Sequence, residues 1–106
     1  MKIRVIRGSK IADLIGYSIT LYPYILLQSG FSRLVEQQVL SHEWVHVEQV
    51  RRYGWFSFYI SYVLEFLAHL VRLKDRQAAY HSISVEVAAY RDQWSVDPDF
   101  SQIEFR

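Results

Sequence analysis

The sequence predicts one α+β domain, in which a short antiparallel sheet from the N-terminal third packs on about three helices. Segments rich in β-branched and aromatic residues precede residue 31, whereas apolar residues recur at helical spacing after it. The chain has 106 residues, of which 51% are hydrophobic, and this is enough for one core. We therefore expect a single domain over residues 1–106, with 95–106 as a C-terminal tail that has no clear structure of its own.

Two N-terminal segments carry the signal for strands. Residues 2–7, "KIRVIR", alternate polar and apolar side chains and predict a short strand, followed by a brief helix or turn over residues 10–15. Residues 17–30, "YSITLYPYILLQSG", predict a second strand. Pro23 cannot donate a hydrogen bond to a neighbouring strand, so this strand should lie at an edge or be broken there.

The first long helix should span residues 33–53, with Ser32 as its N-cap and Gly54 as its stop. Residues 55–73, "WFSFYISYVLEFLAHLVRL", are long and apolar enough to cross a membrane. Four polar residues at every fourth position instead favour a core helix with one solvated face: Ser57, Ser61, Glu65 and His69. A membrane span is the costlier alternative, and an interfacial helix remains open.

The remaining chain should hold one more helix. Residues 74–82 are polar and are expected to form a loop. Residues 82–94 return to helical spacing, with Ser82 or Ser84 as cap.

Composition narrows the classes of function. A net charge of +1 is too small to indicate a nucleic-acid partner. The chain has no cysteine, which excludes disulfides and any zinc site built from thiolates. Charged side chains interrupt the first 13 residues, so no apolar signal-peptide core is evident, and we expect a cytoplasmic protein.

The most informative motif is His-Glu-x-x-His, formed by His42, Glu43 and His46 on the helix expected over 33–53. Histidines four residues apart share one helix face and can point their nitrogens at one metal ion. Glu43 lies beside them and can accept a proton from a water whose pKa zinc depresses. Such a match arises by chance about once in a hundred chains of this composition, so an ordinary polar stripe remains the alternative.

A catalytic zinc site needs a third protein ligand and one open position. Glu86 stands out, because it lies in the apolar stretch "ISVEVAAY", where a carboxylate needs a partner. Small residues at Ala88 and Ala89 would also let its helix approach the first one closely. The other candidates are histidines and acidic residues elsewhere: Glu36, Glu48, Glu65, His69, His81 and the acidic residues of the tail.

The stretch "HEWVHVEQ", a Gly-Trp turn, an aromatic helix and "EVAAY" together resemble a small gluzincin metallopeptidase domain of the minigluzincin type. The resemblance covers about residues 19–90. It implies a zinc-dependent peptidase, with one zinc ion held by His42, His46 and Glu86, and with Glu43 as general base. It also implies that the strand at residues 19–28 forms the rim along which a peptide substrate lies.

Several points stay open at this stage. Tyr80, His81 or Tyr90 could stabilise the developing oxyanion, although each is more often a packed aromatic or loop residue. Latent forms are known among minimal gluzincins, so an acidic residue of the tail could fill the open zinc position: Asp97, Asp99 or Glu104. The rival functions are a non-catalytic zinc-binding or peptide-binding module, a protein associated with a membrane through residues 55–73, and a metal-free helical domain.

Overall fold

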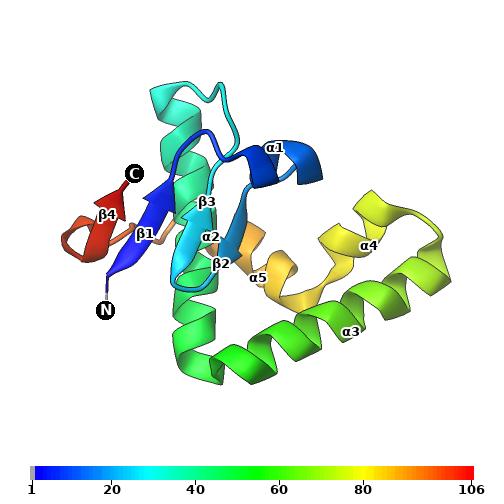
Figure 1. Ribbon diagram of the computed structural model, residues 1–106. Helices are drawn as coiled ribbons and strands as arrows, with labels where there is room; N and C mark the ends of the chain where they lie inside the picture. The colour runs from blue at the N-terminus through cyan, green and yellow to red at the C-terminus, as the bar shows by residue number, and fades with distance from the viewer. Residues whose placement is uncertain (1) are drawn as a thin grey trace.

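The computed structural model describes residues 2–106, and over these residues the architecture is α+β, as the sequence predicts (Figure 1). Four strands form one sheet: β1 (Ile3–Ile6), β2 (Ile19–Leu21), β3 (Tyr24–Leu26) and β4 (Ile103–Phe105). The helices are α1 (Lys10–Ile15), α2 (Arg33–Tyr53), α3 (Trp55–Leu73), α4 (Arg76–Ser82) and α5 (Ser84–Asp92). A 3-10 turn at Phe100–Gln102 precedes β4.

The sheet is mixed, so the expected antiparallel arrangement is wrong in part. The strand order is β2-β3-β1-β4, and β1 is parallel to both β3 and β4, while β2 and β3 are antiparallel. The expected second strand is broken at Pro23 into the β2–β3 hairpin. The expectation that the tail has no regular structure is also wrong, because Ile103 pairs with Ile3 and is buried in the core.

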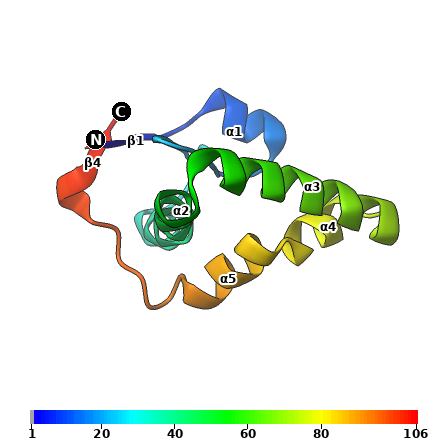
Figure 2. The same cartoon turned by 90° about the horizontal axis from the view of Figure 1, so that it is seen from below.

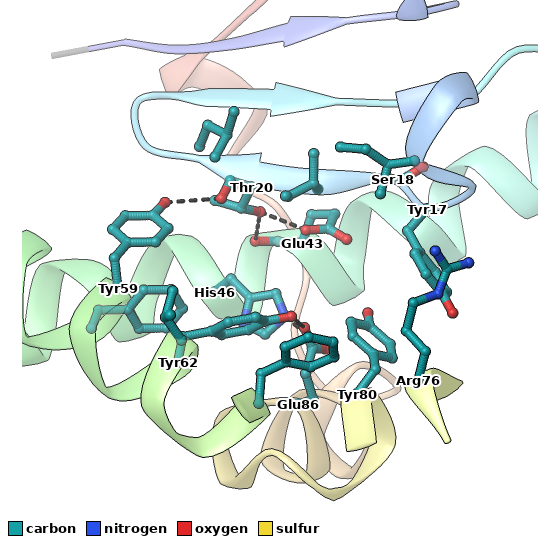
Figure 3. A pocket seen from close by; sticks show the side chains of 16 residues that line it. Tyr17, Ser18, Thr20, Glu43, His46, Tyr59, Tyr62, Arg76, Tyr80 and Glu86 are labelled. Atoms are coloured by element: carbon teal, nitrogen blue, oxygen red, sulfur yellow. Dashed lines mark hydrogen bonds and ion pairs between the residues drawn. The ribbon is translucent and has the colours of Figure 1, made fainter. Parts of the chain in front are cut away.

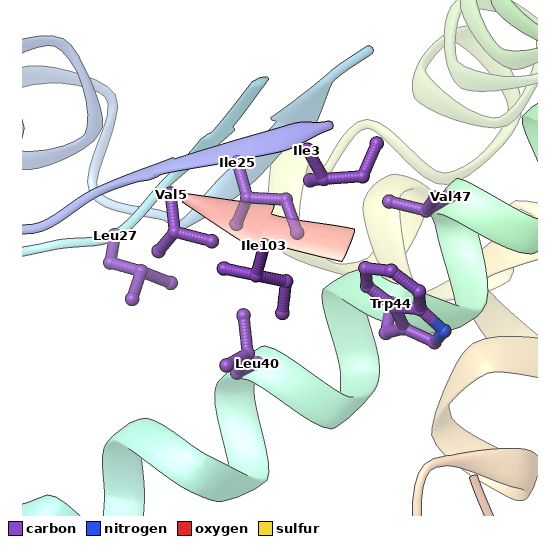
Figure 4. Packing of buried hydrophobic residues seen from close by; sticks show 8 residues of the cluster. All are labelled: Ile3, Val5, Ile25, Leu27, Leu40, Trp44, Val47 and Ile103. Atoms are coloured by element: carbon purple, nitrogen blue, oxygen red, sulfur yellow. The ribbon is translucent and has the colours of Figure 1, made fainter. Parts of the chain in front are cut away.

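The core lies between the sheet and one face of α2 (Figure 4). Leu40, Trp44 and Val47 occupy successive turns of that face, and their side chains are at most 2% exposed. The sheet supplies the opposing side chains: Ile3, Val5, Ile25, Leu27 and Ile103. Each fully buried aliphatic side chain of this kind contributes about 1.5–3 kcal/mol.

Local signals fix the ends of α2 where the sequence predicts them. The hydroxyl of Ser32 accepts a hydrogen bond from the backbone N–H of Val35, and Gly54 ends the helix with a φ of 88°. Viewed nearly along α2, the sheet lies on one side of this helix and α5 lies on the other (Figure 2). One helix therefore presents an apolar face to the sheet and a second face to α5.

The helix α3 has the predicted bounds but not the predicted position. Phe58 is its one buried residue, and much of its apolar surface faces outward, so it is not a core helix. By length and composition it could cross a membrane, and only 6% of its most apolar window is buried. It packs lengthwise on α4 and contacts α2 at its N-terminal end (Figures 1 and 2).

The segment expected as a loop over 74–82 contains the helix α4. Asp75 caps it by accepting hydrogen bonds from the backbone N–H groups of Gln77 and Ala78. The next helix, α5, begins at Ser84 without a side-chain cap, so the predicted serine cap is wrong. The hydroxyl of Ser84 instead donates to Glu65 on α3, 2.8 Å away.

Candidate metal centre

Three side chains meet between α2 and α5. His42 and His46 come from α2, Glu86 comes from α5, and one ligand atom from each lies within 4.8 Å of the others. Nε2 of His42 is 2.9 Å from Oε1 of Glu86, and Nε2 of His46 is 3.0 Å from the same oxygen. All three residues are buried. The structure thus brings together the three residues that the sequence singles out as candidate ligands.

Helical geometry and small residues bring the two helices together here. The four-residue spacing places both histidines on the face of α2 that is turned away from the sheet. On α5, Ala89 lies one turn after Glu86 and is completely buried, as is Ile83, the residue just before the helix. Because alanine projects little beyond the backbone, α5 can approach α2 closely enough for Glu86 to reach both rings.

Two glutamines orient the imidazole rings. Nδ1 of His46 lies 2.8 Å from Oε1 of Gln49, and the Gln49 amide nitrogen donates to the carbonyl of Val85 on α5. Nδ1 of His42 lies 2.8 Å from Oε1 of Gln93. An amide oxygen only accepts hydrogen bonds, so these contacts place a proton on Nδ1 and leave Nε2 free to bind a metal. Amide side chains, rather than carboxylates or backbone carbonyls, occupy these positions.

The donor set fits a metal ion. Two neutral imidazole Nε2 atoms and one carboxylate oxygen converge on a single point, which is the set of donors that divalent transition metals accept. Without a metal, both Nε2 atoms would need protons to bond to the one shared oxygen, so two imidazolium charges would be buried together. A metal ion removes that requirement and satisfies all three groups at once.

The electrostatics of the metal-free cluster agree with a role of these side chains as metal ligands. Burial disfavours the charged form of His46, but Glu86 and then Glu43 outweigh it and raise the pKa of His46 to about 9. Burial alone would raise the pKa of Glu86, but hydrogen bonds from His42 and His46 hold it well below its usual range. The cluster therefore combines an ionised carboxylate with a proton that a metal ion would displace.

Tyr62 on α3 completes the surroundings of Glu86. Its hydroxyl donates to Oε2 of Glu86 over 2.6 Å, and Oε1 faces the histidines. Burial, then the charge of Glu86, raises the pKa of Tyr62, so its hydroxyl remains a donor at neutral pH. Nothing in the sequence distinguishes Tyr62 from the other tyrosines of this chain.

Glu43 lies near His46 and Glu86 without being one of the three candidate ligands, and is itself only 3% exposed (Figure 3). The hydroxyl of Thr20 on β2 lies 2.6 Å from Oε2 of Glu43 and 3.2 Å from its backbone carbonyl. A hydroxyl has one proton, and the shorter contact is the stronger hydrogen bond. Burial raises the pKa of Glu43, while His46 and His42 oppose that rise.

Two cavities reach this cluster from different sides. The larger, of about 360 Å³, lies between β2 and α3 and reaches Glu43, His46 and Glu86 (Figure 3). Its wall is mostly apolar or aromatic and includes Ile19, Phe58, Tyr59, Val63 and Phe66. The smaller, of about 230 Å³, reaches His42 and Glu43. Four residues line both cavities: Tyr17, Ser18, Glu43 and Tyr80. Glu43 is therefore accessible from two directions.

The free edge of the sheet next to Glu43 is partly occupied. The strand β2, Ile19–Leu21, is an edge strand of the sheet, whereas the resemblance implies one rim strand over residues 19–28. The hydroxyl of Tyr59 on α3 donates to the carbonyl of Thr20 and accepts from the backbone N–H of Tyr22. A peptide could pair with the Thr20–Tyr22 part of this edge only if Tyr59 moved away.

The other candidate ligands lie elsewhere. Glu36 pairs with Arg7, Glu65 accepts from Ser84, and His69 bonds to Arg72 rather than to Glu65. Glu48 and His81 are exposed.

The acidic residues of the tail lie away from the three candidate ligands, so the alternative in which one of them fills the open zinc position is not seen. Asp99 caps the 3-10 turn, Glu104 pairs with Arg106, and Asp97 is exposed. The strand β4, near the end of the chain, pairs with β1 at the edge of the sheet opposite β2.

Comparison of the chain with protein-family models, with curated proteins and with solved structures finds no match to any of them.

Proposed function

We propose that this protein is a zinc metallopeptidase of the gluzincin type, in which His42, His46 and Glu86 hold one zinc ion. The observation that carries the proposal is the accessibility of the cluster. Structural zinc sites are closed, whereas catalytic sites keep a position for substrate. Here one cavity reaches His46 and Glu86, another reaches His42, and both reach Glu43.

Zinc is the metal proposed because two imidazoles and one carboxylate form a common ligand set of catalytic zinc in peptidases. When bound, zinc supplies Lewis-acid polarisation of the scissile carbonyl and of the attacking water. The protein supplies the orientation of the ligands. Gln49 and Gln93 hold the two rings through Nδ1, and Tyr62 holds Glu86 through Oε2.

Glu43 is the proposed general base. Thr20 fixes one of its carboxylate oxygens and leaves the other for the proton of the attacking water. The pKa of Glu43 is raised, which makes its carboxylate a better proton acceptor for a reaction near neutral pH. The same oxygen can then return the proton to the leaving amine.

Tyr80 is the proposed donor to the developing oxyanion. It lines both cavities next to Glu43, whereas His81 is exposed and packs against Tyr80 and Tyr90. Burial raises the pKa of Tyr80 far above its usual range, and the charges of Glu86 and Glu43 act in the same direction. Its hydroxyl therefore keeps its proton and can donate a hydrogen bond.

The test compares wild type with Glu43→Gln, both loaded with zinc and incubated with a proteome-derived peptide library. Elemental analysis should find one zinc per chain in both proteins. Mass spectrometry should find cleaved peptides with wild type, and a rate lower by roughly 10²–10⁴-fold with Glu43→Gln. The variant purified in parallel also controls for contaminating peptidases. Equal cleavage by both proteins, or none by zinc-loaded wild type, would overturn the proposal.

A non-catalytic metal centre that ties α2 to α5 is the second candidate. The observation that favours it is the position of Tyr59, whose hydroxyl occupies the strand edge where an extended substrate would pair. In that case Glu43→Gln and wild type bind zinc equally and neither cleaves peptides. Tyr59→Phe separates the two candidates further, because freeing the edge should increase cleavage only in a peptidase.

A further inference from the structure

The outer side of α3 is an exposed apolar stripe. Its members are between 45% and 77% exposed and recur at helical spacing along the whole helix: Phe56, Ile60, Val63, Leu64, Leu67 and Val71. Isolated exposed apolar residues are common on soluble proteins, but a contiguous stripe of this length normally contacts a partner or a membrane. We call these six residues the α3 stripe.

The stripe continues into the mouth of the larger cavity. Val63 belongs to the stripe and also lines that cavity. Across the cavity, Ile15 of α1 and Leu21 of β2 line it and are themselves at least 40% exposed. On α1, Ile11 and Leu14 extend this second apolar margin. Apolar surface thus borders the cavity on both the α3 side and the α1 side.

Basic residues flank both ends of the stripe. Arg51 and Arg52 precede α3, whereas Arg72, Lys74 and Arg76 lie at or beyond its C-terminal end. Between residues 51 and 76 there are two acidic residues, and each accepts hydrogen bonds from backbone N–H groups within the protein: Glu65 and Asp75.

The segment from residue 51 to residue 76 therefore carries five basic and two acidic side chains, which is a local excess of positive charge beside the α3 stripe. Trp55, more than half exposed, lies at the start of α3, where an aromatic ring suits the boundary between water and lipid.

We propose that the α3 stripe docks on the surface of an anionic lipid bilayer, with α3 lying in the plane of the interface and the larger cavity opening beside it. An apolar face flanked by arginine and lysine is the pattern of interfacial helices, and each basic residue near the surface attracts anionic headgroups. A transmembrane position is disfavoured, because the other side of α3 binds β2 through Tyr59 and Glu86 through Tyr62.

A second copy of the chain is a poorer occupant of this face. In a two-fold pairing of antiparallel α3 helices, Arg51 and Arg52 of one copy would face Arg72 and Lys74 of the other. Like charges brought together in this way oppose association. Phosphate headgroups would complement the same residues instead.

The experiment is sedimentation with phosphatidylcholine vesicles that contain or lack phosphatidylglycerol, using wild type, Leu64→Glu and Leu34→Glu. Leu34 is the matched control, since it is also an exposed helical leucine but lies near the start of α2. Wild type and Leu34→Glu should bind the anionic vesicles, and Leu64→Glu should bind roughly tenfold or more weakly, because a buried leucine is worth 1.4 kcal/mol or more. High salt should weaken wild-type binding.

Failure of wild type to bind anionic vesicles would overturn the proposal, as would equal losses in the two variants. A dimer that Leu64→Glu dissociates in analytical ultracentrifugation, without vesicle binding, would assign the stripe to a second copy. Circular dichroism verifies that each variant is folded. Vesicle binding needs neither metal nor peptide cleavage, so its outcome is independent of the proposed peptidase activity.

Discussion

The consecutive helices α2 and α3 are similar in length, 21 and 19 residues, but they differ in which side chains they bury. Eight residues of α2 are buried, and these include His42, Glu43 and His46. Only Phe58 is buried on α3, although α3 is the more apolar helix. Polar groups therefore lie inside the molecule on one helix, and apolar groups lie outside on the next.

Buried ionisable groups on α2 and an exposed apolar stripe on α3 are both unfavourable in an isolated domain, and this is why they are informative. Burying ionisable side chains lowers stability unless they find partners, and here α5 and β2 supply partners for the buried side chains of α2. Exposing an apolar stripe favours association, and α3 provides no partner within the chain. The α2 face thus indicates a metal ligand, and the α3 face indicates an external surface.

The largest effect should follow from Glu86→Gln, which removes the carboxylate ligand while keeping nearly the same shape. The neutral amide is a much weaker metal ligand, so zinc affinity should fall by more than roughly 100-fold, beyond the range seen for residues that only support ligands. Elemental analysis after dialysis should find one zinc per chain in wild type and little in the variant.

Glu65→Gln is the matched control for that change. Glu65 is also a glutamate that accepts hydrogen bonds from the start of α5, but it lies outside the cluster of candidate ligands. It should retain full zinc content. Equal zinc content of wild type and Glu86→Gln would show that Glu86 is not a ligand, and no zinc in wild type would show that the buried cluster is an ordinary hydrogen-bonded network.

The next effect concerns stability and compares one leucine from each helix. Leu40→Ala opens a cavity beneath the sheet, because Leu40 is 2% exposed, and it should lower the free energy of unfolding by about 2–5 kcal/mol. Leu64→Ala, on the α3 stripe, should change it by less than about 0.5 kcal/mol. Urea denaturation measures both. Similar losses would mean that α3 is covered in solution, for example by a second copy.

Local signals explain which parts of the fold could be predicted from the sequence. The bounds of α2 follow from Ser32 and Gly54, which act on the residues next to them. The strand β4 could not be predicted, because its three residues pair with β1 about a hundred positions earlier. The position of α3 was mistaken for the same reason, since periodicity shows which residues share a face but not what covers that face.

In the candidate site, too, some residues could be predicted from local sequence and others only from the fold. His42, Glu43 and His46 were identified because their spacing lies within one helical turn, and Glu86 because a carboxylate is unusual among apolar neighbours. Three other residues that contact the site are far in sequence from the side chains that they bind: Thr20 is 23 positions from Glu43, Tyr62 is 24 from Glu86, and Gln93 is 51 from His42. Gln49 was the one residue within reach of local reasoning, because it lies three positions after His46 on the same helix face.

Gln49→Ala tests the residues that orient the ligands. Without this amide, the His46 ring loses its Nδ1 partner and α2 loses a hydrogen bond to α5, so zinc affinity should fall by about 10–100-fold. Gln37→Ala, at an exposed position on the same helix, is the control and should bind zinc like wild type. Competition with a chromogenic chelator gives both affinities. An unchanged affinity for Gln49→Ala would mean that the ring is held by packing alone.

The smallest effect should be the change in the free energy of unfolding of the metal-free protein per unit of pH. Its folded state raises the pKa of His46 from 6.5 to about 9, so it holds this proton more tightly than the unfolded chain does. That stabilisation is complete below pH 6.5 and is lost as pH rises to 9, at no more than about 1.4 kcal/mol per pH unit. Zinc competes with the same proton, so the stability gained on adding zinc should increase across this window. Urea denaturation between pH 6.5 and 9, with chelator or with zinc, measures both the stability of the metal-free protein and its gain on adding zinc. In His46→Gln the stability of the metal-free protein should depend less on pH. A metal-free protein that grew more stable across the window would contradict the assignment of a bound proton to His46.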